Sequence, residues 1–449
     1  MSTVKNAVAV LLDRKAGYDE AQAYYEGTKG EVFASPAIRA HLRSNGAYRV
    51  NFVRTVVDAV ANRLELANVV GNTQVAQAKI NRIFEQDGFQ LEANDIHLRA
   101  CEFGDAYALV WPDSNGEWQI TYEPATNMTL IYDPETRQKS HAAKMWVDLD
   151  GNTRLNLYFA DRIEKYLSNG DLITTGSQFR RVDTVDNPFG EVPVFHFRTN
   201  RPYGKPEHYD GYALQDMINK TLITHMYTMD YQGAPQRYAL SNFGNDSEFE
   251  DFAEGDTDRE NIGALKNGPG ELWYLKGVNS VGEFKPADPD NFLKPVSEFL
   301  KNLASVTSTP VHFFDRGMSG FSGQALRAAE GPLMKKIGDR QQSFGATWRD
   351  LFRFLLKQDG ISADVTVKWQ SAENLDGLDT WDIMLKKINA GLSHRQALRE
   401  GGYDEVLIEK IMTERAQEAA EGSYYQRKPE ARVAPESGEL HTATTEETQ

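Results

Sequence analysis

The arrangement of this chain follows from residues 289–326, whose sequence is PDNFLKPVSEFLKNLASVTSTPVHFFDRGMSGFSGQAL. Pro289 favours a first helical turn, because its fixed φ suits the helix and its missing N–H is not needed there. The predicted helix ends before Pro310, which disfavours the helical conformation of Thr309 and donates no hydrogen bond. Residues 317–323 contain three glycines, which predicts a flexible loop with little side-chain bulk.

A long second helix is predicted after this loop. Its apolar residues recur at heptad-like steps, which places them on one face. Gly331-Pro332 is expected to kink this helix or to end its first segment. Two interpretations stay open: a helical hairpin inside a core, or a loop that two helices hold out toward another molecule. The stripe comprises Leu326, Leu333, Ile337, Phe344, Trp348, Leu351 and Leu355.

Composition indicates a globular protein. A length of 449 residues is enough for two or three domains, and 40% of the residues are hydrophobic. The single cysteine, Cys101, excludes an internal disulfide and suits a reducing compartment. No apolar run approaches the roughly 18–20 residues that a membrane span needs. The run from Val8 to Leu12 is too short for a signal peptide, so we expect a protein made and kept in a cytoplasm.

The formal net charge is −16. A chain this acidic is a poor candidate for clamping DNA, because phosphate contacts require clustered Lys and Arg. It is compatible with a wall that surrounds nucleic acid without holding it, since acidic side chains repel phosphates. Ordinary solubilising surface charge is the simpler explanation of the same value.

Helical periodicity dominates the first hundred residues, and a two-residue period follows. Between residues 106 and 197, short alternating segments are separated by turn sequences such as Ser114-Asn115-Gly116, which predicts an antiparallel meander. The expected helices are 2–26 (one or two short helices), 51–64, 74–84 and 93–103. The expected strands are 106–111, 118–122, 128–132, 142–147, 155–159, 163–167 and 192–197.

A helix is expected from about Tyr209 to Tyr231, and an unusual segment, residues 236–288, follows it. Strands are expected at 238–240 and 271–275, but the segment is acidic and poor in apolar residues between 245 and 258. So small a segment has little material for its own core. We therefore expect it to pack against copies of itself or against another protein.

The C-terminal part is predicted to be helical. A strand is expected at 365–369, and Ser393 and Asp404 are good N-caps for two of the helices that follow. From Gly422 onward the composition of Glu, Thr, Ser and Pro predicts a disordered tail. The expected helices are 378–390, 393–400 and 404–420.

The sequence contains no recognised catalytic motif: no G-x-x-x-x-G-K-[ST] phosphate loop, no G-x-S-x-G, no H-E-x-x-H and no C-x-x-C. His196 and His208 are the nearest histidine pair with acids close by, but they lack metal-ligand spacing. Residues 246–258 lack the ligand alternation and central glycine of a calcium loop. Cys101 lies in a helical stretch where a buried small residue is expected. We therefore expect no catalytic, cofactor or metal site, and no enzyme.

The order of these segments resembles bacteriophage portal proteins, in particular the SPP1-like siphophage portal family of Gram-positive hosts. Short motifs carry the resemblance over roughly residues 20–415, and their order and spacing are more specific than any one of them. The motifs are Tyr24-Tyr25-Glu26-Gly27, Gly104–Val110 (GDAYALV), Glu191–Phe195 (EVPVF), Gly211–Thr221, Ala234-Pro235-Gln236-Arg237 and Ser322–Leu326 (SGQAL).

The resemblance implies an α+β portal fold with an antiparallel β-rich wing and long helices, assembled as a ring of identical subunits, twelve in the family's usual form. It assigns the chain as follows: 1–207 wing, 208–235 first stem helix, 236–288 clip, 289–308 second stem helix, 309–322 tunnel loop, 323–374 long wing helix and strand, 375–421 helical crown and 422–449 tail.

The resemblance also implies a function. The ring would be the channel for DNA packaging and ejection at one capsid vertex, in the virion after assembly in the host cytoplasm. Its partners would be the major capsid protein, the terminase large subunit, the head–tail connector or adaptor, the scaffold protein and the double-stranded DNA in the channel. The residues facing DNA would be Arg316, Gly317, Met318, Ser319, Gly320, Phe321 and Ser322. Those docking terminase or the connector would be Asp246, Glu248, Glu250, Asp251, Asp256 and Asp258.

Four basic residues, one beside the glycine-rich loop and three in the helix after it, differ from the acidic residues that a purely repulsive wall would have. We expect Arg316, Lys335, Lys336 and Arg340 to pair with acids of a neighbouring subunit rather than with phosphates, since surface basic residues are mostly solvated or loosely paired. Two other classes of protein stay open. One is a nucleic-acid-processing enzyme with an acidic metal site, and the other is a different capsid or adaptor protein.

Overall fold

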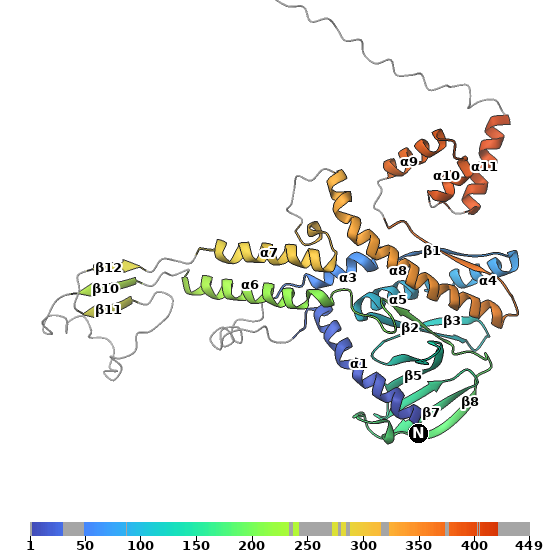
Figure 1. Cartoon of the computed structure of the whole chain (residues 1–449), viewed down its shortest axis with the longest axis horizontal. Helices are drawn as coiled ribbons and strands as arrows, with labels where there is room; N and C mark the ends of the chain where they lie inside the picture. The colour runs from blue at the N-terminus through green and yellow to red at the C-terminus, as the bar shows by residue number, and fades with distance from the viewer. Residues whose placement is uncertain are drawn as a thin grey trace, which may run out of the picture. The chain divides into compact units, whose positions relative to one another are not determined.

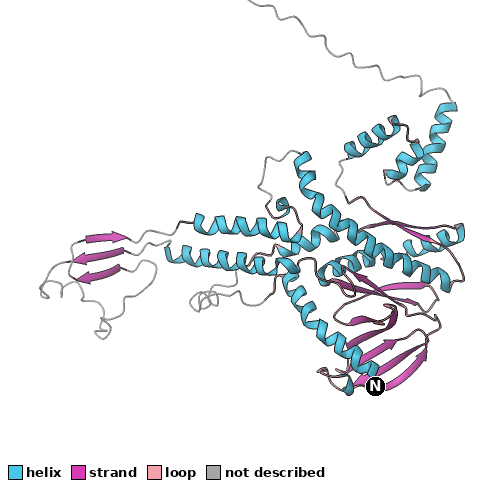
Figure 2. Cartoon of the chain, in the orientation of Figure 1, coloured by secondary structure: helices cyan, strands magenta, loops and turns pink. Residues whose placement is uncertain are grey.

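The computed structural model describes residues 2–29, 49–86, 88–232, 237–241, 272–276, 280–283, 288–315, 323–372, 377–401, 403 and 405–420. The chain divides into two compact units, residues 1–372 and 373–449, and each is described by itself. Helices and mainly antiparallel sheets share the first unit, whereas the described part of the second is helical (Figures 1 and 2). The predicted α+β class is confirmed.

The first unit begins with helices. Helix α1 is one continuous helix of 25 residues rather than two short ones. The Thr73 side chain caps α4 by accepting a hydrogen bond from the backbone N–H of Ala76. These helices are α1 (Ser2–Glu26), α3 (Val53–Ala61), α4 (Gln74–Phe84) and α5 (Phe89–Phe103).

The predicted single meander is instead two sheets. The first has the order β3-β2-β9, and the second is a true meander, β4-β5-β6-β7-β8. The first sheet comprises β2 (Asp105–Pro112), β3 (Trp118–Glu123) and β9 (Val194–Arg198). The second comprises β4 (Met128–Tyr132), β5 (Lys139–Val147), β6 (Thr153–Tyr158), β7 (Arg162–Ser168) and β8 (Arg180–Asp186), with the 3₁₀ turn η1 (Gly176–Gln178) before β8.

Long-range pairing explains this error. Strand β9 pairs with β2, so that Asp105 lies opposite Arg198, and alternation within each strand carries no information about such a partner. Strand β8 was missed because all seven of its residues are exposed, which leaves no apolar alternation to detect.

Two long helices run antiparallel and side by side (Figure 1). The start of the first lies at the end of the second, since a Cβ on Gly211 would come within 2.7 Å of Leu303. At the other end, the rings of His225 and Phe292 lie 5.0 Å apart. The two long helices are α6 (Tyr212–Gln232) and α7 (Asp290–Thr307), and the 3₁₀ turn η2 (Tyr209–Gly211) directly precedes α6.

Between α6 and α7 the structure describes a small three-stranded sheet of order β11-β10-β12. The first two strands are parallel, and the third is antiparallel to β10. The sequence predicted the first two but not the third, which has only four residues. The strands are β10 (Arg237–Ser241), β11 (Leu272–Lys276) and β12 (Ser280–Glu283). The acidic residues predicted for docking, 246–258, lie outside the described residues.

After α7 comes the 3₁₀ turn η4 (Val311–Phe313), and then the 36-residue helix α8 (Gly323–Gln358). Of the two alternatives expected at Gly331-Pro332, a kink or the end of a first segment, the second is wrong, because α8 continues through Pro332. Proline removes one hydrogen bond, whereas Leu333 and Ile337 directly after it are fully buried and hold the helix in place. Strand β13 (Val365–Trp369) then pairs antiparallel with β1 (Leu66–Gly71), which the sequence had not predicted.

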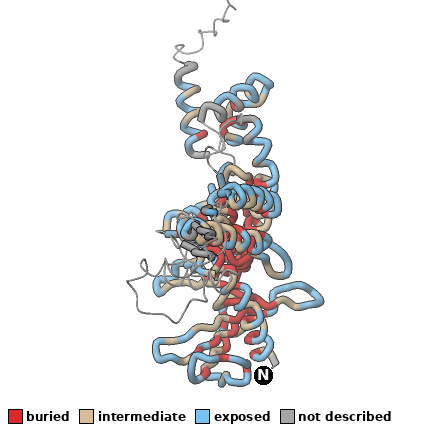
Figure 3. The backbone as a smooth tube through the Cα atoms, turned by 90° about the vertical axis from the view of Figure 1, so that its left-hand side faces the viewer, coloured by how far each residue is buried: buried red, intermediate tan, exposed pale blue. Residues whose placement is uncertain are grey.

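Helix α8 supplies one wall of the main core. Six residues of its predicted stripe are at most 2% exposed, and they pack with residues of α3, α4, α5 and β9. Buried residues form the interior of the chain trace and exposed residues its outer loops (Figure 3). Prominent core members are Val57, Ile80, Ile96, Phe197, Leu333, Phe344, Trp348 and Leu351.

The second unit has a small core of its own, which includes Met384, Leu398 and Ile408. The Ser393 side chain accepts a hydrogen bond from the backbone N–H of Gln396, which confirms it as an N-cap. Asp404 and the tail from Gly422 lie outside the described residues. The helices are α9 (Gly377–Asn389), α10 (His394–Glu400) and α11 (Glu405–Ala420).

Candidate functional site: the α7–α8 junction and its buried ion pairs

The predicted DNA-facing loop follows the buried C-terminal end of α7 and the turn η4. Its residues Arg316 to Ser322 are outside the described residues, and the chain on both sides is described. On the α7 side, Thr307 and Thr309 are at most 3% exposed, and the Thr307 hydroxyl donates to the Leu303 carbonyl at 2.6 Å. Ser308 ends α7 in the left-handed conformation, at φ 54°. The chain is therefore buried and hydrogen-bonded at the end of α7, through Thr309.

A buried carboxylate connects this junction to the rest of the first unit. The Glu207 side chain is 2% exposed and forms ion pairs with two cations of α8, Lys336 (2.6 Å) and Arg340. Burial raises the pKa of Glu207, but the charges of Lys336 and Arg340 outweigh that effect and lower the pKa below its usual value. Glu207 is therefore ionised in the folded protein.

The two cations also bind backbone carbonyls. Lys336 Nζ donates to the Thr307 carbonyl at 3.2 Å, and Arg340 Nη1 donates to the Thr199 carbonyl at 2.9 Å. We expected both residues to pair with acids of a neighbouring subunit, and this is wrong: they pair with Glu207 of their own chain. The cause is tertiary, because Glu207 is more than a hundred residues away in the sequence. Lys335 is also paired within its own helix, with Asp339.

A second set of contacts holds the turn η4. His312 Nε2 lies 3.3 Å from Glu330 Oε1 of α8, and Arg63 Nη2 lies 3.9 Å from the same oxygen. The Arg63 guanidinium also lies over the Phe313 ring, 5.2 Å from its centroid. Helix α8 thus contacts the chain both before and after Ser308.

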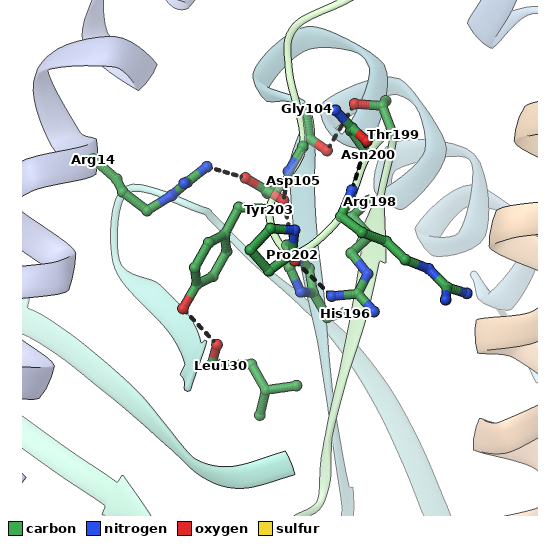
Figure 4. Close-up of polar contacts among 12 residues, drawn as sticks. Arg14, Gly104, Asp105, Leu130, His196, Arg198, Thr199, Asn200, Pro202 and Tyr203 are labelled. Atoms are coloured by element: carbon green, nitrogen blue, oxygen red, sulfur yellow. Dashed lines mark hydrogen bonds and ion pairs between the residues drawn. The ribbon is translucent and has the colours of Figure 1, made fainter. Parts of the chain in front are cut away.

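A second buried carboxylate, Asp105, lies in the motif GDAYALV (Figure 4). Arg14 and Tyr18 donate to its Oδ2 at 2.5 and 2.8 Å. His196 Nε2 and the Gly204 backbone N–H donate to its Oδ1, both at 2.7 Å. Burial raises the pKa of Asp105, but the His196 hydrogen bond and the Arg14 charge lower it further than burial raises it.

His196 is the buried histidine of this network, and its side chain is 1% exposed. Burial lowers its pKa, although the neighbouring Asp105 raises it. The Tyr132 hydroxyl lies 2.9 Å from Nδ1, and with the proton on Nε2, which faces Asp105, Nδ1 accepts from that hydroxyl. His196 and Asp105 form a pair rather than a metal site, and within the described part of the chain no group of three or more His, Cys, Asp or Glu could hold a metal ion.

The glycine of the same motif has a steric role. Gly104 has a φ of 86°, and a Cβ on it would lie 2.5 Å from the backbone N of Lys205. A Cβ on Gly204 would lie 1.8 Å from the Gly104 carbonyl oxygen. The two backbones therefore touch, which brings the Gly204 N–H to Asp105 and places Glu207 beside α8.

Cys101 and His208 lie in the interior of the first unit. Cys101 is fully buried, as predicted, and burial raises the pKa of its thiol. His208 is also fully buried, and its Nε2 lies 3.0 Å from the Ala21 carbonyl. Among the helices that the structure describes, none is both long enough and apolar enough to cross a membrane.

The chain belongs to the phage portal protein family described as SPP1 Gp6-like, whose family model matches residues 9–420. The predicted family and the predicted portal fold are therefore confirmed. The chain is 22% identical over 378 residues to the portal protein of Mycobacterium phage D29, which covers 80% of this chain and 75% of that protein. It is 23% identical over 326 residues to the portal protein of Mycobacterium phage L5, covering 68% of this chain and 64% of that protein.

Solved structures with a similar chain trace include the neck of an empty gene transfer agent particle computed with C6 symmetry. The sequence identity is 13% and the TM-score 0.46, with 83% of this chain and 95% of that chain covered. An HK97-family phage portal protein from Corynebacterium diphtheriae matches at 11% identity and a TM-score of 0.34, with 76% and 96% covered.

Sequence reasoning missed the buried carboxylates. Asp105 directly follows the Gly104 turn, and Glu207 directly follows residues 200–206, which contain two prolines and a glycine. A single acid at a predicted strand start was the available signal, but nothing in the local pattern distinguishes it from a solvated turn residue. The partners, Arg14, His196, Lys336 and Arg340, are distant in sequence.

Proposed function

We propose that this portal protein forms a ring at one vertex of a phage capsid and is the channel through which DNA is packaged and ejected. The match of the portal family model over residues 9–420 carries this proposal. The antiparallel pair α6–α7 and the contact of Lys336 with the end of α7 support it, because they hold in place the helix end that precedes residues 316–322. We propose a twelve-membered closed ring of this chain, located in the virion after assembly in the host cytoplasm.

We propose the following parts. Residues 1–207 and 323–374 are the wing, 208–235 and 289–308 the stem, and 236–288 the clip. Residues 309–322 are the tunnel loop and 375–421 the crown. Because residues 309–314 are buried or partly buried, the segment proposed to face DNA is residues 316–322, which comprises Arg316, Gly317, Met318, Ser319, Gly320, Phe321 and Ser322.

The charges of α7 are compatible with DNA sliding past a stem helix. Lys294 pairs with Asp290 at 3.0 Å, and Lys301 pairs with Glu298 at 2.7 Å, each within about one helical turn. Such exposed pairs add little stability. They do neutralise each cation locally, so phosphates passing this surface meet charge pairs rather than isolated lysines. The proposed wall is therefore locally neutral here, and the net charge of −16 does not require a repulsive surface.

The proposed partners are the major capsid protein, the scaffold protein, the terminase large subunit and the head–tail connector. We propose that terminase and the connector dock on the clip through Asp246, Glu248, Glu250, Asp251, Asp256 and Asp258. The double variant Asp251→Lys/Asp256→Lys should weaken terminase binding and packaging. Glu436→Lys/Glu439→Lys in the tail makes the same charge change and should not. Equal packaging by both would contradict docking on this surface.

We propose no catalytic activity for the chain, so the experiment concerns assembly and DNA content. Deleting residues 317–322 should leave ring formation intact, measured by mass photometry, and should reduce the DNA packaged or retained per capsid. Deleting residues 442–447 removes the same number of residues outside the matched region and is the control.

The two outcomes that would contradict the proposal are distinct. A protein that stays monomeric and never enters capsids would exclude a portal. Rings that form with the deletion and package normally would exclude a role of residues 316–322 in the channel.

A further inference from the structure

Lys336 joins three separate parts of the first unit. Its Nζ lies 2.6 Å from Glu207 Oε2, in the segment before α6, and donates to the carbonyl of Thr307, the last residue of α7. The Lys336 side chain is 17% exposed and that of Glu207 is 2% exposed. A single cation of α8 thus contacts both the end of α7 and the chain before α6.

Lys336 is one of two side-chain donors to the last carbonyl of α7, because the Thr309 hydroxyl also donates to the Thr307 carbonyl, at 3.4 Å. The last carbonyls of a helix have no partner within it, and the helix dipole places partial negative charge there. Basic side chains in the last turn commonly compensate that charge, but α7 has none. Lys336 supplies the missing cation from another helix, which ties the direction of α7 to that of α8.

Arg340 holds the other side of the same carboxylate. One turn further along α8, it pairs with Glu207 and donates to the Thr199 carbonyl, directly after β9. Glu207 therefore pairs with two cations: Lys336, which also contacts the end of α7, and Arg340, which also contacts the chain directly after β9. The two contacts can be disrupted separately.

We propose that Lys336, oriented by Glu207, is a positioning residue that fixes the end of α7 on α8 and so sets where the chain leaves the fold toward residues 316–322. The significance for packaging rests on the proposed function. The contact of Lys336 with Glu207 and Thr307 does not depend on the proposed function, because all three residues belong to the described part of the chain.

Hydrogen exchange tests the contact directly. In Lys336→Met, the amides of Ser308 and Thr309, which donate to Ser305 and Ala304, should exchange about tenfold faster, as expected for a loss of ~1.4 kcal/mol in local opening. Arg340→Met should instead accelerate exchange at the end of β9. Lys335→Met changes the neighbouring, exposed lysine, which pairs with Asp339 of its own helix, and should affect neither.

DNA content tests the consequence. Capsids with Lys336→Met rings should package or retain several-fold less DNA than those with Lys335→Met, and Lys336→Arg, which keeps the cation and a donor, should restore most of the difference. If Lys336→Met fails to fold, Lys336→Gln, which keeps a donor but removes the cation, is measured in its place, and faster exchange at Ser308 and Thr309 is expected of it.

The outcomes separate the two proposals. If deletion of residues 317–322 impairs packaging but Lys336→Met behaves like Lys335→Met in exchange and in DNA content, only the positioning role is wrong. If the deletion packages normally, the proposed channel function is wrong, whatever the exchange measurement shows.

Discussion

Two buried carboxylates, Asp105 and Glu207, organise the polar contacts of the first unit. Each is at most 6% exposed as a residue and receives at least two cationic or neutral donors from distant parts of the chain. Removing one partner of a buried pair leaves an uncompensated charge, which is strongly destabilising, whereas an exposed pair contributes little. Individual substitutions at these two positions should therefore have unusually large effects.

Asp105→Asn should lower the free energy of unfolding by about 3 kcal/mol, because Arg14 would then lie beside a neutral amide inside the protein. Asp183→Asn removes an exposed carboxylate that pairs with Lys165, and should change stability by less than ~1 kcal/mol. Denaturant unfolding followed by tryptophan fluorescence measures both. Equal destabilisation by the two variants would contradict the role of Asp105.

Stability should fall as pH decreases from about 6.5 to 4, because of buried neutral histidines. Burial lowers the pKa of His97 to about 4, and its ring binds the Leu64 carbonyl through Nδ1 and accepts from Trp348 through Nε2. In the unfolded chain His97 takes up a proton near pH 6.5, whereas in the folded chain it stays unprotonated until about pH 4. The free energy of unfolding therefore decreases as pH falls through this range.

For a shift of this size, His97 alone would contribute about 3 kcal/mol by pH 4. Thermal unfolding between pH 7 and pH 4.5 measures the slope, and His97→Gln should make it shallower while lowering stability at pH 7. An unchanged slope in His97→Gln would show that His97 does not contribute to it. His208, whose pKa burial also lowers to about 4, should contribute to the same slope.

Two glycines of the first unit, Gly204 and Gly338, differ in whether they leave room for a larger side chain. Gly204 lies where two backbones touch, at the point that sets the positions of Asp105 and Glu207. Gly338 lies on the exposed side of α8, and a Cβ there would meet nothing within 4 Å. A side chain therefore has room at Gly338 but none at Gly204.

Gly204→Ala should prevent folding of the first unit or destabilise it by several kcal/mol, because its Cβ would overlap the Gly104 carbonyl. Gly338→Ala should instead stabilise the protein by ~0.5–1 kcal/mol, since glycine is a poor residue in a helix interior. Expression yield and thermal unfolding of the two variants measure this difference. A stable Gly204→Ala protein would contradict the close approach of residues 104 and 204.

The two compact units have separate cores. The cores of residues 1–372 and the small cluster of Met384, Leu398 and Ile408 share no residue in the described part of the chain. Each can therefore be considered as a folding unit with its own hydrophobic interior.

A chain that ends at Ala372 should fold, with a thermal midpoint within about 3 °C of that of the first transition in the full chain, the shift that ~1 kcal/mol produces in a large domain. Circular dichroism and calorimetry of the two proteins make the comparison. Aggregation of the shortened chain, or a much larger decrease in midpoint, would show that the first unit depends on residues after Ala372.

Local periodicity was sufficient for most elements and for the main core. The buried face of α8 and the strand at Val365–Trp369 follow from spacing alone, because side-chain direction repeats every 3.6 residues in a helix and every two in a strand. The motif order also pointed to the portal family, which the family match over residues 9–420 confirms.

Local periodicity could not predict which strands pair or which charged side chains form ion pairs. Several contacts join residues that are far apart in the sequence. They are the pairing of β9 with β2, the pairing of β13 with β1, and the ion pairs of Glu207 with Lys336 and Arg340. Spacing records which face of an element is apolar but not what lies opposite it. Those partners are selected when the elements pack, because burial makes an unpaired charge or an unpaired strand edge too costly to leave.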